Sequence, residues 1–203
     1  MSQKPKETFT QIITKRREPN RYLLWMGIGG IAFLFFVLTA LYLARKGRPG
    51  WTDFHLPFVF YISTVLILLS SYTLWRADQS FKKEQFKAYT RLTGLTLFLG
   101  CAFIISQFLG WKELVTGGVH MKNSISGAFV YILSGLHVAH ILGGLVFLYI
   151  AFMKALKNRT YVDAFVYSVN PPNQLRLSLI SVYWHFVDIL WLYLFAFFLI
   201  NHW

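Results

Sequence analysis

Five apolar runs, each long enough to cross a lipid bilayer as a helix, constrain this chain more than any other feature. A helix needs about 20 apolar residues to span the roughly 30 Å hydrocarbon core. Only 14% of the residues are charged, against about a quarter in soluble domains. The sequence therefore predicts an all-α, polytopic membrane helix bundle, with a basic tail at 1–22 and one five-helix domain at 23–203. The expected spans cover about 23–44, 57–75, 92–111, 127–153 and 178–200.

The distribution of basic residues predicts the orientation of this bundle. The N-terminal tail and the segments 76–91 and 154–177 carry fifteen of the 20 lysines and arginines, and the segments 45–56 and 112–126 carry the other five. Because cytoplasmic loops are enriched in Lys and Arg, we expect the N-terminus in the cytoplasm and the C-terminus outside. The net charge of +12 lies outside the apolar runs, so it predicts orientation and no nucleic-acid partner. Pro171-Pro172 predicts an extended turn before the last helix.

The last apolar run has a histidine and a carboxylate in its middle. A charged side chain at the centre of a spanning helix costs about 2.5–3.5 kcal/mol, so Asp188 is expected to be neutral, paired or turned toward protein. At about 3.6 residues per turn, Asp188 shares one side of the helix with Trp184, His185 and Trp191. These four residues predict a polar stripe, flanked by tryptophans, that faces a partner.

The fourth run adds His137 and His140, and three interpretations compete for these ionisable groups. Two histidines on different helices can hold a haem iron, although no carboxylate motif accompanies them and Cys101 stands alone. Chains of histidine and aspartate also move protons across membranes. The third interpretation, which the residues favour, is a hydrogen-bonded set that joins the last two spans to each other, to a partner or to lipid headgroups. Polar groups inside a membrane must be satisfied, and neighbouring helices commonly satisfy them.

Small and hydroxyl-bearing residues predict further helix contacts. Gly135, Ala139 and Gly143 are spaced four apart, which is typical of a stripe for close helix packing. The hydroxyl groups of the second span are expected to bond to carbonyls of their own helix; they belong to Ser63, Thr64, Ser70, Ser71 and Thr73. The sequence contains no nucleophile–base pair, phosphate loop or paired-carboxylate site, so it predicts no catalytic residue, no metal site and no chemistry by this chain alone.

Two motifs resemble those of one known family. The segment 183–192, YWHFVDILWL, is similar to the signature of the last helix of subunit III of haem–copper oxidases. The segment 135–144, GLHVAHILGG, resembles that family's G-x-H-x-x-H-x-x-x-G helix. Leu56-Pro57 with the hydroxyl residues of the second span, and Gln107 with Trp111 in the third, also fit. The resemblance covers about residues 23–201 and is to the five-helix bacterial form.

This resemblance implies an accessory, non-catalytic subunit of a proton-pumping terminal oxidase, cytochrome c oxidase, in aerobic respiration. Such a chain binds no haem or copper, which reside in the partner subunits. Subunit I is the expected direct partner, with subunit II, a small subunit IV and a respiratory supercomplex as further candidates. The implied roles are stability, phospholipid binding and proton uptake, in a bacterial cytoplasmic membrane. Structural, lipid-contacting or subunit-contacting roles are implied for His137, His140, Trp184, His185, Asp188 and Trp191.

The first run departs from the family pattern. The family usually carries a glutamate in the helix corresponding to 23–44, and this run has no acid, with Gly30, Ile31, Ala32 and Phe33 near the expected place. A proton role tied to that glutamate therefore does not carry over. Three alternatives stay open: a subunit III of a quinol-oxidising relative, a small b-type cytochrome using the histidines, and a relay or transporter acting alone through the last span.

Overall fold

Six helices account for most of the residues described by the computed structural model, which are 9–52, 54–122, 124–158 and 161–202, without the side chains of 9–19, 167 and 171. Five of the six are long and apolar enough to cross a membrane, which confirms the predicted all-α bundle of five spans. The helices are α1 (Phe9–Arg45), α2 (Phe58–Lys82), α3 (Phe86–Thr116), α4 (Ile125–Lys157), α5 (Tyr161–Val169) and α6 (Pro171–Asn201).

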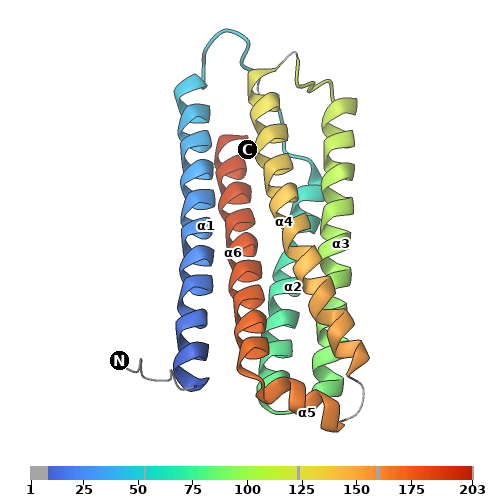
Figure 1. Ribbon diagram of the computed structural model, residues 1–203. Helices are drawn as coiled ribbons and strands as arrows, with labels where there is room; N and C mark the ends of the chain where they lie inside the picture. The colour runs from blue at the N-terminus through green and yellow to red at the C-terminus, as the bar shows by residue number, and fades with distance from the viewer. Residues whose placement is uncertain (1–8, 53, 123, 159–160, 203) are drawn as a thin grey trace, which may run out of the picture.

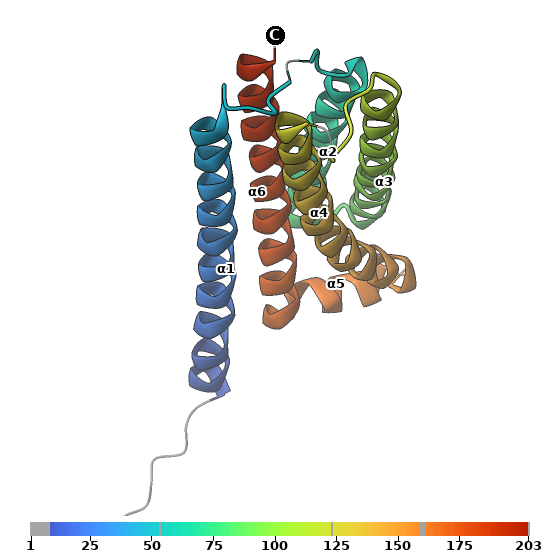
Figure 2. The same ribbon diagram turned by 90° about the horizontal axis from the view of Figure 1, so that it is seen from above.

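The long helices lie side by side, and α1 begins at the opposite end of the bundle from the one at which α6 ends (Figure 1). Helix α1 forms one edge and neighbours α6 and α4, whereas α2 and α3 form the most extensive pair (Figure 2). The short α5 lies across the end of the bundle at which α6 begins, and it contacts α6. Helix α6 therefore has α1, α2, α4 and α5 as neighbours.

Several boundaries differ from the prediction, since α2 continues to Lys82 and α3 begins at Phe86. Helix α1 begins at Phe9, inside the expected basic tail, of which residues 1–8 lie outside the described residues. The expected loop 154–177 contains α5. The expected turn before the last span is wrong, because α6 begins at Pro171 and the extended residue is Asn170, with ψ of 114°. Proline suits the first helical turn, where its missing N–H would have no intrahelical partner.

The interior is built from aromatic rings that meet edge to face. Trp191 and Phe103 have ring centroids 5.0 Å apart, and Trp191 and Phe60 have centroids 5.8 Å apart. All three side chains are fully buried, one each from α6, α3 and α2. Such pairs contribute about 0.5–1.5 kcal/mol beyond the area that they bury. The aromatic cluster therefore fixes the levels at which these three helices meet.

Candidate functional site

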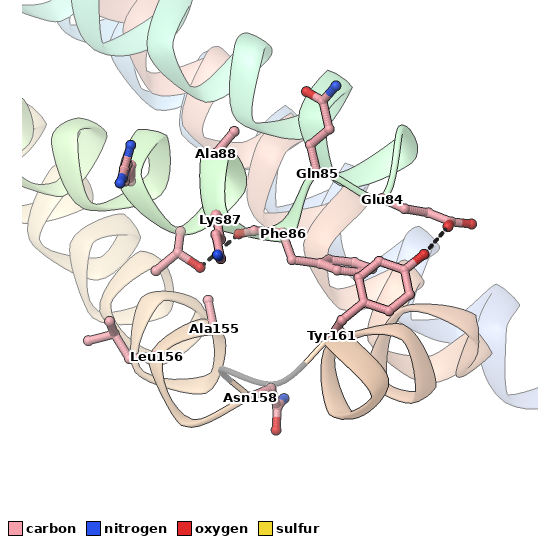
Figure 3. Close-up of a pocket in the computed structure, with 11 residues that line it drawn as sticks. Glu84, Gln85, Phe86, Lys87, Ala88, Ala155, Leu156, Asn158 and Tyr161 are labelled. Atoms are coloured by element: carbon pink, nitrogen blue, oxygen red, sulfur yellow. Dashed lines mark hydrogen bonds between the residues drawn. The ribbon is translucent and has the colours of Figure 1, made fainter.

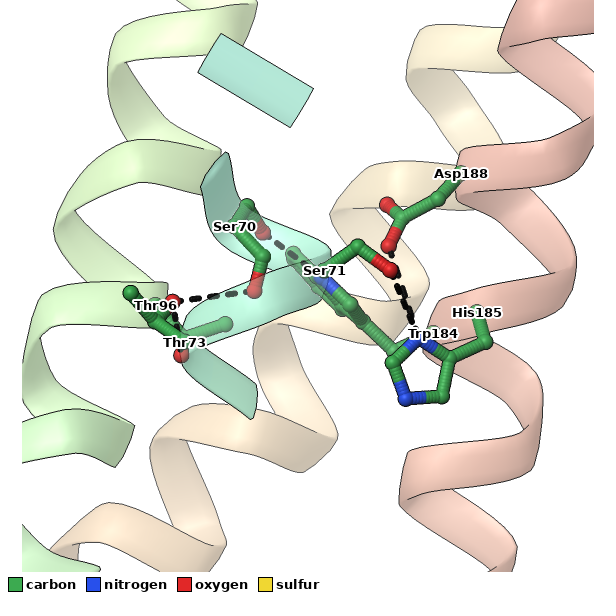
Figure 4. A network of polar contacts seen from close by, with 7 residues as sticks. All are labelled: Ser70, Ser71, Thr73, Thr96, Trp184, His185 and Asp188. Atoms are coloured by element: carbon green, nitrogen blue, oxygen red, sulfur yellow. Dashed lines mark hydrogen bonds and ion pairs between the residues drawn. The ribbon is translucent and has the colours of Figure 1, made fainter. Parts of the chain in front are cut away.

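The polar stripe of α6 faces α2 of the same chain. The indole N–H of Trp184 donates to Ser70 Oγ at 2.8 Å, and the indole N–H of Trp191 donates to Thr64 Oγ1 at 3.0 Å. A third bond joins His185 Nδ1 and Ser71 Oγ at 2.8 Å (Figure 4). Interhelical hydrogen bonds in membranes average about 0.6 kcal/mol, with a maximum near 1.7 kcal/mol. Two of them lie at nearly the same level and the third about two turns farther along α6, and together they join α6 to α2 in one register.

Trp184 also joins α6 to α3 and α4 through two glycines. A Cβ atom at Gly100 of α3 would lie 2.9 Å from Trp184 Cη2, and a Cβ atom at Gly144 of α4 would lie 3.2 Å from Trp184 Cε3. The indole, which is fully buried, therefore occupies space that a side chain at either position would need. Close approach of this kind is the usual role of small residues between membrane helices.

The predicted small-residue stripe on α4 makes no such contact with the described residues of this chain. A Cβ atom at Gly135 or Gly143 would find its nearest neighbour at ordinary van der Waals distance, 3.8 Å for Trp111 and 3.9 Å for Tyr183. Ala139, between them, is exposed. The α4 glycine that packs tightly against another spanning helix is Gly144, which follows Gly143 and lies outside the predicted stripe. Any close packing by the stripe would have to involve another subunit or lipid, and it stays a prediction.

His137 lies in the interior beside Trp191. Its ring centroid is 5.3 Å from that of Trp191 and 5.8 Å from that of Phe103, and the residue is fully buried. Neither ring nitrogen has a hydrogen-bond partner among the described residues. The same holds for the amide of Gln107, which lies one helical turn beyond Phe103 on α3. His137 of α4 therefore lies against the aromatic cluster that joins α2, α3 and α6, and Gln107 lies one turn from its member Phe103.

Asp188 is buried next to the α6–α2 hydrogen bonds. It is 2% exposed, and its Oδ2 lies 3.9 Å from His185 Nδ1, at the limit of an ion pair. The hydroxyl of Ser71, which bonds His185, lies beside the carboxyl group (Figure 4). No described residue makes a hydrogen bond of good geometry to either carboxyl oxygen. The carboxyl group thus faces α2 inside the chain, which is one of the three outcomes expected for it.

His140 has different neighbours from the other two histidines of the spans. Its Nδ1 bonds the carbonyl oxygen of Leu136 at 2.7 Å, and its ring meets Phe35 of α1 edge to face at 5.8 Å. The carbonyl oxygen of His140 accepts a hydrogen bond from Tyr183 of α6 at 3.0 Å. His140 therefore supports the contact of α4 with α1 and α6.

The three histidines do not converge on one space. His137 faces Phe103 and Trp191, His140 faces α1, and His185 faces α2. Within the described part of the chain, no three His, Cys, Asp or Glu side chains come together as a metal site. The arrangement is that of side chains joining helices, and it does not favour a pair of axial haem ligands.

The hydrogen-bond partners on α2 are the residues whose role the sequence did not reveal. Ser63 and Thr73 bond carbonyls of their own helix, as expected, and Thr64 does so while it also accepts from Trp191. Ser70 and Ser71 instead bond side chains of α6, which lie 114 positions away in the sequence. Hydroxyl groups in a membrane helix can do either. No local signal separates the two cases.

Comparison with known proteins places the chain among oxidase subunits. Residues 50–203 match the family model described as Cytochrome c oxidase subunit III. A cytochrome c oxidase subunit 3 of a Bacillus species is 31% identical over 183 residues, covering 87% of this chain and 84% of the relative. A probable cytochrome c oxidase subunit 3 of Nocardia farcinica is 30% identical over 203 residues, covering 95% and 94%. A probable quinol oxidase subunit 3 of Staphylococcus saprophyticus is 29% identical over 183 residues, covering 87% and 86%.

Proposed function

The chain belongs to the cytochrome c oxidase subunit III family, and on this premise we propose how it serves a terminal oxidase. We propose that it is a pre-formed helical scaffold that packs against the catalytic subunit, subunit I, and stabilises it during turnover. Members of this family are accessory subunits without a cofactor of their own, and this chain is a multi-pass membrane protein. Haem and copper belong, in this proposal, to the partner subunits.

The observation that carries the proposal is the use of the motif residues within the chain. Trp184, Trp191 and Asp188 are buried between helices of this subunit, so they lie too deep to touch a reactant, a lipid or another subunit directly. Their contacts join α6 to α2, α3 and α4. A role in holding the bundle in one shape suits this position. Of the six residues with implied roles, His185 and His140 are only partly buried, so these two have surface left for a subunit or a lipid.

A groove between α1, α4 and α6 supports the phospholipid part of the proposal. It has a volume of about 640 Å³ and is lined mostly by apolar side chains, with Lys154 and Arg176 at the end where α6 begins. An acyl chain would fit the apolar wall, and a lipid phosphate would pair with the two cations. We infer that this groove holds a lipid between α1 and the rest of the bundle.

Cytochrome c is the electron donor that we propose for the complex, with quinol as the alternative. Relatives of both names cover similar lengths of this chain at similar identity. Support of proton uptake is also part of the proposal, and it follows from stabilising the catalytic subunit. A proton relay through His185 and Asp188, which lie 3.9 Å apart beside Ser71, is the alternative. The bacterial cytoplasmic membrane, with the N-terminus inside, is the proposed location.

The deciding experiment is purification through an affinity tag on this chain. We expect the tagged chain to bring down a haem-containing and copper-containing complex that reduces oxygen with reduced cytochrome c. The chain separated from that complex should show no Soret absorption. A stoichiometric Soret band on the separated chain would contradict the proposal and favour the small cytochrome. Oxidation of quinol but not of cytochrome c would leave the scaffold role intact and change the donor.

A further inference from the structure

A second groove, of about 880 Å³, opens at the end of the bundle where α3 begins and α4 ends (Figure 3). Its apolar wall includes Phe86 of α3 and Ala155 and Leu156 of α4. Its polar rim includes Lys87 and Arg91 of α3. This groove is separate from the one between α1, α4 and α6, because the two share no lining residue.

The rim carries two cations, and both come from α3. Lys87 and Arg91 are four residues apart on α3, so they project from the same face, with Cβ atoms about 5–6 Å apart. Both are exposed, and neither forms a salt bridge with a described residue. Like charges at this spacing destabilise a helix by a few tenths of a kcal/mol. An anion between them would remove that repulsion.

The carboxylate that lines the groove, Glu84, accepts a hydrogen bond and forms no ion pair with a described residue. The hydroxyl of Tyr161 on α5 donates to Glu84 Oε2 at 2.8 Å, and Figure 3 shows the tyrosine turned toward that carboxylate. Glu84 has φ of 59°, in the left-handed region that side chains other than glycine seldom adopt. This contact ties α5 to the α2–α3 connection and forms one wall of the groove. With two cations against one carboxylate, the lining of the groove keeps a net positive charge.

The depth of the groove matches the headgroup layer of a bilayer. Helix α3 has 31 residues, about ten more than a span requires, so its ends extend beyond the hydrocarbon. Its apolar run begins at Leu92, which places Arg91 at the hydrocarbon edge and Lys87 one turn farther out. The apolar run of α4 ends at Met153, so Ala155 and Leu156 lie at the same edge. Cations and an apolar wall thus meet where lipid phosphates reside.

We propose that this groove binds the headgroup of an anionic phospholipid. The phosphate lies between the Lys87 ammonium and the Arg91 guanidinium, and the upper part of an acyl chain lies along Ala155 and Leu156. The start of α3 adds the positive end of a helix dipole, and its N-cap residue Gln85 makes no side-chain capping bond to the first N–H groups. Basic grooves between membrane helices commonly select anionic headgroups in this way.

The test uses the intact oxidase complex, equilibrated with a mixture of phosphatidylglycerol and phosphatidylcholine and weighed by native mass spectrometry. The double variant Lys87→Gln, Arg91→Gln is expected to retain one phosphatidylglycerol molecule fewer than the wild type. Each cation contributes about fivefold to the affinity for an anionic headgroup. In the double variant the preference for phosphatidylglycerol over phosphatidylcholine at this site should therefore fall roughly thirty-fold. Unchanged retention in the double variant would overturn the proposal.

Three further variants make the result specific. Lys112→Gln, Lys122→Gln removes two cations at the opposite end of the bundle and should retain every lipid. Lys87→Arg, Arg91→Lys preserves the charge and should also retain the lipid. Lys154→Gln, Arg176→Gln alters the groove between α1, α4 and α6, so its lipid is counted separately. Loss of the phosphatidylglycerol molecule in either the Lys112→Gln, Lys122→Gln variant or the charge-preserving variant would contradict a site at the start of α3.

Two measurements on the wild-type complex do not depend on any variant folding. A photoactivatable phosphatidylglycerol is expected to label the peptides at the start of α3 and the end of α4. Labelling confined to other peptides would overturn the proposal. An excess of inorganic phosphate should leave the lipid bound, because the acyl contact contributes to binding. Displacement by phosphate alone would identify a free-anion site in place of a lipid site.

Discussion

The indole ring of Trp184 fills the space that a side chain at Gly100 would occupy. A Cβ atom at Gly100 would lie 2.9 Å from Trp184 Cη2 and 2.8 Å from Leu145 Cδ2, both closer than side-chain atoms normally approach. The ring cannot retreat easily, since its N–H is bonded to Ser70 on the far side and it is fully buried. This one indole therefore sets the separation of α3 and α6 and, through its hydrogen bond, the register of α2.

Replacing Gly100 by alanine should destabilise the bundle. Overfilling a packed interior costs about 1–3 kcal/mol, which exceeds the gain of up to about 1 kcal/mol from helix propensity. The measurement is the free energy of unfolding of the purified subunit in detergent, titrated with SDS. Gly29→Ala is the matched control, because nothing lies within 4 Å of a Cβ atom there. Equal stability of the two variants would show that Trp184 can move aside.

Trp184→Phe removes the hydrogen bond to Ser70 and part of the ring that fills the interior. We expect a loss of about 1–2 kcal/mol in the free energy of unfolding. The control is Trp75→Phe, since Trp75 is 49% exposed on α2 and should tolerate the change within about 0.5 kcal/mol. A Ser70→Ala variant that is as stable as the wild type would assign the whole loss to packing.

Asp188→Asn separates the structural role from the proton-relay alternative. The amide keeps the shape of the side chain and cannot ionise, and charge in a span is costly. We expect the complex to retain the subunit and to take up protons at a rate within about twofold of wild type. The measurement is proton uptake during oxygen reduction, followed with a pH-indicator dye. A tenfold or greater slowing would favour the relay.

The contact of Tyr161 with Glu84 predicts an alkaline transition of α5. The hydrogen bond to Glu84, followed by burial and by the negative charge of Glu84, raises the pKa of Tyr161 above its ordinary value of 10.0. Because the folded-state pKa is raised, the contact contributes its full stabilisation of the fold below pH 10. This stabilisation is lost as pH rises through the higher folded-state pKa. Glu84→Gln should lower the pKa of Tyr161, measured as the tyrosinate absorbance that disappears in Tyr161→Phe. An unchanged pKa would contradict this contact.

The class of the molecule and its spans could be predicted because each depends on one segment at a time. A run of some twenty apolar residues crosses a bilayer as a helix whatever its neighbours are, since the backbone must satisfy its own hydrogen bonds in lipid. The common face of Trp184, His185 and Asp188 follows from helical geometry in the same way. The start of α6 was misplaced because Pro171 can either precede a helix or begin one.

The partners of those residues could not be predicted. Ser70 and Ser71 have the same local pattern as Ser63, yet they bond α6 while Ser63 bonds its own helix. The spacing of small residues predicts close packing at Gly135 and Gly143, yet the indole ring of Trp184 packs against Gly100 and Gly144. A periodic pattern identifies a face of a helix and says nothing of the ring that covers it.

The sequence by itself determined a five-span membrane bundle, the depth of its ionisable groups and its resemblance to the oxidase subunit. The tertiary structure alone decided that the stripe on α6 faces α2 inside the chain, and that Lys87 and Arg91 border a groove with the end of α4. Hydropathy is a local property of a segment. Which helices become neighbours depends on how rings, glycines and hydroxyl groups fit together across segments more than a hundred residues apart, as in the bond between Trp184 and Ser70.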